Sequence, residues 1–284
     1  MIINYNTKLI TANCINSINN NSTLNGLNYE IIVVDNNSTD FSMEFFQERK
    51  FENTKIIKNK KNDGFGKANN IGVNYSKGEF LVLLNSDTIV EETNFLNLLS
   101  AFEKNDEMGI LSVKILNEDN TIQSVGFDLP SLRNELKLNL LFWNFSFIKN
   151  IRYKNYKNKQ IFKVGWVSGC FMVMRQKDYH LVGGFDEKIF MYAEDIDLCY
   201  RLSKQKKYSY IFDETSIYHL HGKSGDKKNV KLKKMFENKS NFYYVIEKNN
   251  IFSKRKINIS KFSFCMHAIL LVSIKKIRNF VTRH

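Results

Sequence analysis

Short apolar runs that end in polar residues alternate with helical patterns along the first half of the chain. Residues 30–35 are apolar and β-branched up to a closing Asp35, which is typical of a fully buried parallel strand. Residues 55–58 form a weaker run of this kind and residues 79–84 a strong one. Strands that alternate with helices predict an α/β fold with a mostly parallel central sheet and helices on both faces.

The intervening helices are predicted from apolar residues that recur three and four positions apart. They are Leu9, Cys14 and Ile18 behind a candidate cap at Thr7, then Phe41, Phe45 and Phe46 behind Ser38 or Asp40, then Phe95, Leu98, Leu99 and Phe102 behind Thr93. A further helix is predicted over residues 194–204, after regular structure returns at 165–174. Between them, residues 127–163 lose all periodicity and read as a long excursion.

Polar residues close each predicted strand, and they form a consistent set. Asn4-Tyr5-Asn6 ends the first strand, Asp35-Asn36-Asn37-Ser38 the second, and Asn85-Ser86-Asp87 the strong one. Open α/β sheets bind ligands beyond the carboxyl ends of their strands. We therefore expect these three segments to lie along one rim of a ligand site.

Charge is distributed very unevenly along the 284 residues. The net charge is +13, yet residues 1–220 hold 26 basic and 26 acidic side chains, whereas residues 221–284 hold 16 basic and three acidic ones. The neutral body argues against a nucleic-acid-binding protein. The apolar stretch 262–274 is too short to span a bilayer and is flanked by basic residues. It fits a basic amphipathic helix on an anionic membrane surface or, equally, a helix docked on the domain.

The four cysteines are scattered without a Cys-x-x-Cys pair, and no signal peptide is evident. These features indicate a reduced, cytoplasmic protein.

Two carboxylates at strand ends are candidates for binding a ligand. Asp87 stands where a divalent ion and a diphosphate could meet, although an Asx turn is an alternative interpretation. Asp35 could accept a hydrogen bond from a pyrimidine imide, or it could cap the following helix.

Acidic and basic clusters later in the chain are candidates for catalysis. Glu194, Asp195 and Asp197 fall within one helical turn, where capping explains one or two acids and a general base would explain a third. The segment 218–224 offers His219, His221 and Lys223 as partners for a metal or a diphosphate, or as ordinary exposed residues.

Taken together, these segments resemble the family 2 glycosyltransferases, in particular the rhamnosyltransferase-like branch that builds bacterial surface polysaccharides. The resemblance covers residues 1 to about 224 and rests on the order and spacing of several motifs. They are Asn4-Tyr5-Asn6, residues 33–40, residues 62–70, Leu83 to Asp87, Gly169 to Met172, Gly183 to Glu187, Phe190 to Leu198 and His219 to Ser224.

The resemblance implies a GT-A type fold over residues 1–224, with residues 127–163 on the acceptor side and a basic helical tail over 225–284. It implies a catalytic base at Asp195 with Glu194 beside it, and a divalent cation, Mn²⁺ or Mg²⁺, held by Asp87 and His219. The implied donor-nucleotide contacts are Tyr5, Asp35, Asn37, Gly64, Gly66, Asn69, Asn85 and Ser86, and the candidate diphosphate contacts are His221, Lys223 and Ser224.

Two departures from the family pattern stand out. Only Met1, Ile2 and Ile3 precede Asn4, so a short first strand is expected. Two explanations are a start assigned too late in the sequence and a protein whose activity is partly impaired. Asn85 also replaces the usual first Asp of Asp-x-Asp, which removes one carboxylate.

The function implied is an inverting transfer of a sugar, rhamnose being one candidate, from a dTDP- or UDP-sugar to a lipid-linked surface glycan. The expected place of action is the inner face of a bacterial cell membrane. The alternative is a catalytically impaired nucleotide-sugar-binding or scaffolding protein of the same fold.

Overall fold

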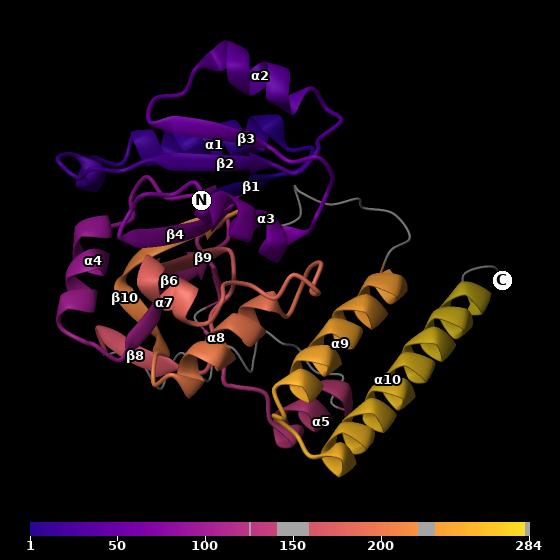
Figure 1. Ribbon diagram of the computed structural model, residues 1–284. Coiled ribbons are helices and arrows are strands. Elements are labelled where there is room, and N and C mark those ends of the chain that lie inside the picture. Colours follow the sequence, from indigo (N-terminus) through magenta and orange to yellow (C-terminus); the bar gives the residue numbers. More distant parts are fainter. Residues whose placement is uncertain (125, 141–158, 221–230, 282–284) are drawn as a thin grey trace.

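The computed structural model describes residues 1–124, 126–140, 159–220 and 231–281. Its centre is a single sheet in the order β3-β2-β1-β4-β9-β6-β10-β5, with β7 beside β6 and β8 beside β10 (Figure 1). The strands are β1 Ile2–Asn4, β2 Ile31–Asp35, β3 Thr54–Lys58, β4 Phe80–Asn85, β5 Thr88–Ile89, β6 Met108–Leu116, β7 Ile122–Ser124, β8 Ile161–Val164, β9 Phe171–Arg175 and β10 Tyr208–His219.

The direction of the strands follows the predicted pattern over most of the sheet. β3, β2, β1 and β4 are parallel neighbours, and β10 is parallel to β6. β9 lies between β4 and β6 and is antiparallel to both, so β4 and β6 run the same way. The short β1 is placed between β2 and β4, with Ile2 opposite Val33 on one side and Leu84 on the other.

Helices cover both faces of the sheet, as predicted. They are α1 Lys8–Asn19, α2 Ser42–Arg49, α3 Phe65–Val73, α4 Phe95–Glu103, α5 Leu132–Leu140, α7 Gln176–Leu181, α8 Glu194–Lys204, α9 Lys231–Lys248 and α10 Lys254–Val281, with a 3-10 turn η1 at Ser22–Leu24. Val33 packs with α1 and α2 on one face, and its neighbours Ile32 and Val34 pack with α3 on the other. Residues that alternate along one strand therefore fill two cores, which explains the continuous apolar run.

The predicted helix caps are partly confirmed. α8 begins at Glu194 and ends at Lys204, as predicted. The N-cap of α2 is Phe41, so neither Ser38 nor Asp40 occupies the position expected for it. The Asp40 carboxylate still accepts a hydrogen bond at 3.1 Å from the backbone N–H of Ser42, the first residue of α2. The cap of α4 is Asn94 and not Thr93, because the Thr93 hydroxyl donates to the carbonyl of Ser216 instead.

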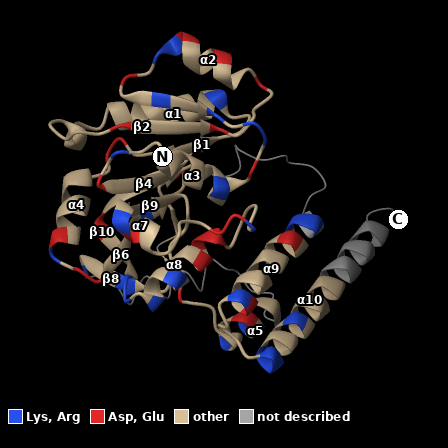
Figure 2. Ribbon diagram, in the orientation of Figure 1, with Lys and Arg blue, Asp and Glu red and all other residues tan. Residues whose placement is uncertain are grey.

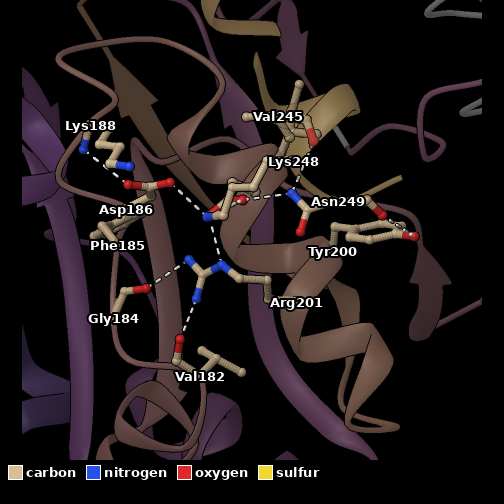
Figure 3. Close-up of polar contacts among 12 residues, drawn as sticks. Val182, Gly184, Phe185, Asp186, Lys188, Tyr200, Arg201, Val245, Lys248 and Asn249 are labelled. Carbon is tan, nitrogen blue, oxygen red and sulfur yellow. Dashed lines mark hydrogen bonds and ion pairs between the residues drawn. The ribbon is translucent and has the colours of Figure 1, made fainter. Parts of the chain in front are cut away.

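A buried carboxylate, Asp197, ties α8 to its surroundings. Figure 3 shows three side chains that contact it, Arg201, Lys248 and Asn249, together with Asp186. The Asp197 side chain is fully buried and accepts from Arg201 Nε at 2.7 Å and from Asn249 Nδ2 at 2.8 Å. Lys248 Nζ lies 3.2 Å from Asp197 and 2.6 Å from Asp186, in the loop before α8. We call these five residues the charge hub.

The charge hub joins three segments of the chain. Besides Asp197, Arg201 donates to the backbone carbonyls of Val182 at 2.5 Å and Gly184 at 2.7 Å. Asp197 and Arg201 belong to α8, Asp186 to the preceding loop, and Lys248 to the end of α9. The last helical turn of α9 is therefore fixed to the start of α8.

The C-terminal helices α9 and α10 pack together with α5 beside the sheet domain (Figure 1). Lys239 of α9 pairs with the Glu135 carboxylate of α5, and Asn139 of α5 donates to the Ser263 hydroxyl of α10 at 2.8 Å. Part of the excursion at 127–163 therefore forms α5 and contacts these helices, while residues 141–158 lie outside the described part. Figure 2 marks Lys and Arg positions in blue on α9 and near the start of α10.

We expect Arg201→Met to lower the free energy of unfolding by about 3 kcal/mol, because removing one partner leaves a buried carboxylate undercompensated. Urea denaturation measures this change. Lys233→Met is the matched control, since Lys233 belongs to an exposed pair with Glu237 and should change stability by less than about 0.5 kcal/mol. Equal losses in the two variants would contradict a stabilising charge hub.

Candidate active site

The predicted rim residues gather at the carboxyl ends of the parallel strands. Asn4 ends β1, Asp35 ends β2, Asn85 ends β4 and His219 ends β10. The sheet order brings these strand ends to one edge, where Asp87 follows β4 directly. The expectation that segments far apart in sequence meet along one rim is confirmed by this arrangement.

Asp35 organises the β1 and β2 ends of the rim. Its buried carboxylate accepts from Asn4 Nδ2 at 2.7 Å and from the Ser38 backbone N–H at 3.1 Å. It therefore closes a turn rather than capping α2. Tyr5 and Asn37 flank this turn with exposed side chains, and Asn37 has a left-handed backbone with φ 63°. Base contacts from these residues stay a prediction.

Asn36 is a rim residue that the sequence analysis did not select. It is buried, and its Nδ2 donates to Asn62 Oδ1 at 2.9 Å and to the Gly64 carbonyl at 3.2 Å. Its Oδ1 accepts from Asn59 Nδ2 at 2.9 Å and from the Asp63 N–H at 3.2 Å. The two donor and two acceptor positions of the Asn36 amide are therefore all used to hold the loop that leads into α3.

The two glycines in that loop allow close packing against the segment before α8. Gly64 has φ 81°, and a Cβ placed there would lie 2.0 Å from the Phe190 carbonyl oxygen. A Cβ on Gly66 would lie 2.9 Å from Phe185 Cβ. Asn69 is fully buried, donates to the Phe65 carbonyl at 3.0 Å, and has an Oδ1 without a partner among the described residues. Close packing explains why glycine occupies positions 64 and 66. Contacts of Gly64, Gly66 and Asn69 with a nucleotide-sugar stay a prediction.

Asp87 and His219 meet at the strand ends. Asp87 Oδ1 lies 3.1 Å from His219 Nε2, and both side chains are nearly buried. His219 Nδ1 lies 2.7 Å from the amide oxygen of Gln123, whose own Nε2 donates to Asn117 and to the His219 carbonyl. An amide oxygen only accepts, so Nδ1 must carry a proton.

This tautomer has a consequence for the space between Asp87 and His219. A ring protonated on Nδ1 alone presents its Nε2 lone pair towards the Asp87 carboxylate and towards the Asn85 amide, whose Nδ2 lies 3.3 Å away. A carboxylate oxygen and an imidazole nitrogen are both ligands that divalent cations accept. The pair therefore suits a cation, and Gln123 in β7 is an orienting residue that the sequence did not reveal.

Asn85 and Ser86 complete the turn after β4. Asn85 Nδ2 lies 3.3 Å from His219 Nε2, and its carbonyl accepts from the Thr88 hydroxyl at 2.7 Å. Ser86 is buried and accepts from the Thr7 hydroxyl at 3.4 Å. The backbone turns at Ser86 and Asp87, and the Asp87 side chain is directed at His219. The Asx-turn interpretation stays a prediction.

Glu194 and Asp195 begin α8 close to this turn. Asp195 Oδ2 accepts from the Gly169 N–H at 3.2 Å, and the next carbonyl, that of Cys170, accepts from the Asn85 N–H at 3.1 Å. Two adjacent residues thus connect the acids of α8 with the turn that carries Asp87.

Burial dominates the electrostatics of the two acids. It raises the pKa of Asp195 to about 6. Burial and the negative charge of Asp195 raise the pKa of Glu194 to about 8. Glu194 Oε2 has no hydrogen-bond partner among the described residues. At neutral pH the pair therefore holds a proton on Glu194 and a carboxylate on Asp195, which suits proton removal by Asp195.

The remaining predicted residues do not join this group. Asp197, on the same helical turn, belongs to the charge hub and is saturated by Arg201, Lys248 and Asn249. His221, Lys223 and Ser224 lie outside the described residues. In the part of the chain that is described, no three His, Cys, Asp or Glu side chains cluster in a way that could hold a metal.

Comparison with known proteins places the chain in context. The model of the family described as Glycosyl transferase family 2 matches residues 1–182. Rhamnosyltransferase WbbL of Escherichia coli is 30% identical over 151 residues, covering 49% of this chain and 54% of that protein. N-acetylglucosaminyl-diphospho-decaprenol L-rhamnosyltransferase of Mycobacterium tuberculosis is 27% identical over 206 residues, covering 66% of each. The chain thus spans about half to two thirds of these relatives.

Solved structures share the fold at low sequence identity. GalNAc-T7 with UDP, GalNAc and Mn²⁺ superposes with a TM-score of 0.62 at 15% identity, over 87% of this chain and 47% of that one. The mannosyltransferase PcManGT from Pyrobaculum calidifontis, in complex with GDP-Man and Mn²⁺, gives 0.61 at 12% identity, over 97% and 74%. The predicted GT-A type α/β fold is confirmed by these superpositions.

We expect Glu194→Gln to flatten the pH dependence of stability. The pKa of Glu194 is about 8 in the folded protein, above its ordinary value of 4.5. The folded state therefore binds this proton more tightly than the unfolded chain does, and stability falls as pH rises between these values. Urea unfolding across this range should show a smaller decline in Glu194→Gln than in the wild type.

The exposed Glu187 provides the control, because Glu187→Gln should keep the wild-type decline. If Glu194→Gln declined as steeply as the wild type, Glu194 would not carry the perturbed proton.

Proposed function

The chain belongs to glycosyl transferase family 2, and on this premise we propose that it is an inverting glycosyltransferase. It moves a sugar, rhamnose in our proposal, from a dTDP- or UDP-sugar to a hydroxyl of a growing, lipid-linked surface glycan. The observation that carries the proposal is the short path from Asp195 through Gly169 and Cys170 to the turn of Asn85 and Asp87. It brings a carboxylate with a raised pKa beside the strand ends where α/β sheets bind ligands.

The donor nucleotide is proposed to lie along the β1, β2 and β4 ends. Asp35 and Asn85 would face the base and the ribose-diphosphate portion, with Tyr5 and Asn37 exposed at the margin. Gly64, Gly66 and Asn69 would bound this space from the α3 side. Two structurally similar proteins support a nucleotide-sugar donor, since GalNAc-T7 has been solved with UDP and PcManGT with GDP-Man.

A divalent cation, Mn²⁺ or Mg²⁺, fits the Asp87–His219 pair. One carboxylate oxygen and one imidazole nitrogen suffice, because such ions complete their coordination with substrate phosphates and water. Gln123 would orient His219, because its amide oxygen accepts a hydrogen bond from the Nδ1–H. When bound, the cation supplies positive charge that stabilises the departing diphosphate.

The reaction we propose is a single displacement. The acceptor oxygen attacks the anomeric carbon while the bond from that carbon to the diphosphate oxygen breaks. Asp195 takes the proton of the acceptor hydroxyl, and the nucleoside diphosphate leaves with the bonding electrons. Glu194, which keeps its own proton up to a pH of about 8, leaves Asp195 as the ionised member of the pair.

The acceptor is proposed to be a sugar carried on a polyprenyl diphosphate. The mycobacterial relative is an N-acetylglucosaminyl-diphospho-decaprenol L-rhamnosyltransferase. This similarity supports both a rhamnose donor and a polyprenyl-diphosphate acceptor. Residues 127–163 remain our candidates for acceptor contacts.

Contact with an anionic membrane surface is proposed for α10. One of its sides packs on α5 and α9, while large apolar residues remain exposed on the other. They recur three and four positions apart at Ile259, Phe262, Met266, Ile269 and Leu270, near the exposed basic residues Lys254, Arg255, Lys256 and Lys261. The packed side of α10 supports docking on the domain, and its exposed apolar side supports contact with lipid. No described helix is long and apolar enough to cross a bilayer.

We expect Asp87→Ala to weaken Mn²⁺-dependent nucleotide binding by at least about tenfold, because it removes the only carboxylate beside His219 in the described rim. Calorimetric titration with UDP, dTDP and GDP, with and without Mn²⁺, measures this effect.

Asp195→Asn is the matched variant, since it should keep nucleotide binding while sugar transfer falls by a factor on the order of 100 or more. Full activity of Asp195→Asn would disprove the assigned base. Nucleotide binding without any transfer in the wild type would favour the impaired, scaffolding alternative.

For the membrane contact, we expect replacing Phe262 and Ile269 together by Ser to weaken binding to phosphatidylglycerol vesicles by about 10- to 100-fold, since two apolar side chains no longer enter the interface. Vesicle co-sedimentation measures this. The control replaces Leu96 and Leu181, exposed leucines of α4 and α7, by Ser and should bind like the wild type. Equal binding of both double variants would contradict a lipid-facing α10.

A further inference from the structure

Three consecutive large side chains are exposed immediately before α8. Phe190 is 52% exposed, Met191 40% and Tyr192 37%. The backbone is left-handed at Tyr192 (φ 69°) and at Ala193 (φ 74°), a conformation that costs about 1–3 kcal/mol for each non-glycine residue. We call residues 190–192 the platform loop. Because these side chains are 37–52% exposed, their burial offsets this strain only in part.

The platform loop is held from two sides. On the α3 side, the Phe65 N–H donates to the Phe190 carbonyl at 3.0 Å, and Gly64 packs directly on that carbonyl. On the α9 side, Asn241 Nδ2 donates to the Met191 carbonyl at 2.8 Å. The exposed rings are thus presented by a fixed backbone, since both flanking segments bind it.

The platform loop lies next to the proposed base. Tyr192 precedes Asp195 by three residues, a separation of at most about 11 Å along the chain. Phe65, which binds the Phe190 carbonyl, also approaches the base, because a Cβ on Gly169 would lie 3.2 Å from the Phe65 ring and 3.9 Å from Asp195 Cβ. Aromatic surface therefore lies at the place where an acceptor hydroxyl must arrive.

A cation accompanies the aromatic surface. Lys234, an exposed residue of α9, has its ammonium 5.0 Å from the centre of the Tyr192 ring. An aromatic ring offers an apolar face for the C–H side of a sugar, and an ammonium offers a charge for a phosphate. These two chemistries, side by side, match a sugar attached to a diphosphate.

We propose that Phe190 and Tyr192 bind the acceptor sugar by stacking and that Lys234 binds the diphosphate which joins this sugar to its lipid. The proposal rests on the proposed function, because it assigns the acceptor subsite of that reaction. It makes α9 part of the substrate site, through Lys234 directly and through Asn241 as a positioning residue for the loop.

The test uses the full chain loaded with nucleotide and Mn²⁺, titrated calorimetrically with N-acetylglucosaminyl diphosphate carrying a farnesyl group. Tyr192→Asn removes the ring with a side chain that tolerates the left-handed backbone. We expect it to raise the Kd of this probe about tenfold, the cost of one lost aromatic contact. Tyr192→Phe, which keeps the ring, should stay within about twofold of the wild type.

Tyr75 supplies a matched control. It is 46% exposed and has the ammonium of Lys55 4.6 Å from its ring, yet it lies beyond the C-terminal end of α3. Tyr75→Asn should leave the Kd unchanged. Lys234→Gln should weaken binding of the diphosphate probe but not that of octyl N-acetylglucosaminide, which lacks the diphosphate.

The outcomes separate this proposal from the function on which it rests. If the wild type and Tyr192→Asn bind the probe equally, or if neither binds it, while both bind nucleotide, the proposed role of the platform loop is wrong. Failure of the wild type to bind any of the three nucleotides contradicts the proposed function itself.

Discussion

The buried carboxylate of Asp197 is the constraint on which the arrangement of the site depends. A charge without access to water must be matched by opposite charge and hydrogen bonds, and here the partners come from α8, from backbone carbonyls before it through Arg201, and from the end of α9. The first turn of α8 is fixed as a result. Asp195 lies two residues before Asp197, so its position depends in part on the charge that Lys248 supplies from the end of α9.

Glu194, Asp195 and Asp197 lie on one helical turn and would repel one another if all three were ionised in the same environment. The structure separates them by environment. Asp197 is neutralised by cations, Asp195 accepts from the backbone N–H groups of Gly169 and Ile196, and Glu194 has one oxygen without a partner. Different surroundings give different proton affinities, and this separation lets one acid remain charged at neutral pH while its neighbour stays neutral.

The sequence was most informative where one local pattern decides the outcome. The apolar run before Asp35, the limits of α8 and the meeting of strand ends followed from periodicity and from the rules of parallel sheets. It was least informative where a role depends on distant partners. Gln123 has no local signature, and only the pairing of β7 with β6 brings it to His219. Gly64 and Gly66 are expected to bound a ligand, and that stays a prediction; their close packing against Phe190 and Phe185, 126 and 119 positions away, had no signal in the sequence.

The strand order has a consequence for how the protein acquires its site during synthesis. Asn85 contacts His219 across 134 positions, and β5 at residues 88–89 pairs with β10, which ends at His219. Contacts so distant along the chain form slowly and only after the intervening loops have closed. A ribosome must therefore release most of the chain before Asp87 and His219 can meet. Until then β6 has no β10 to pair with. During this period the unpaired strand of the nascent chain can aggregate or bind chaperones.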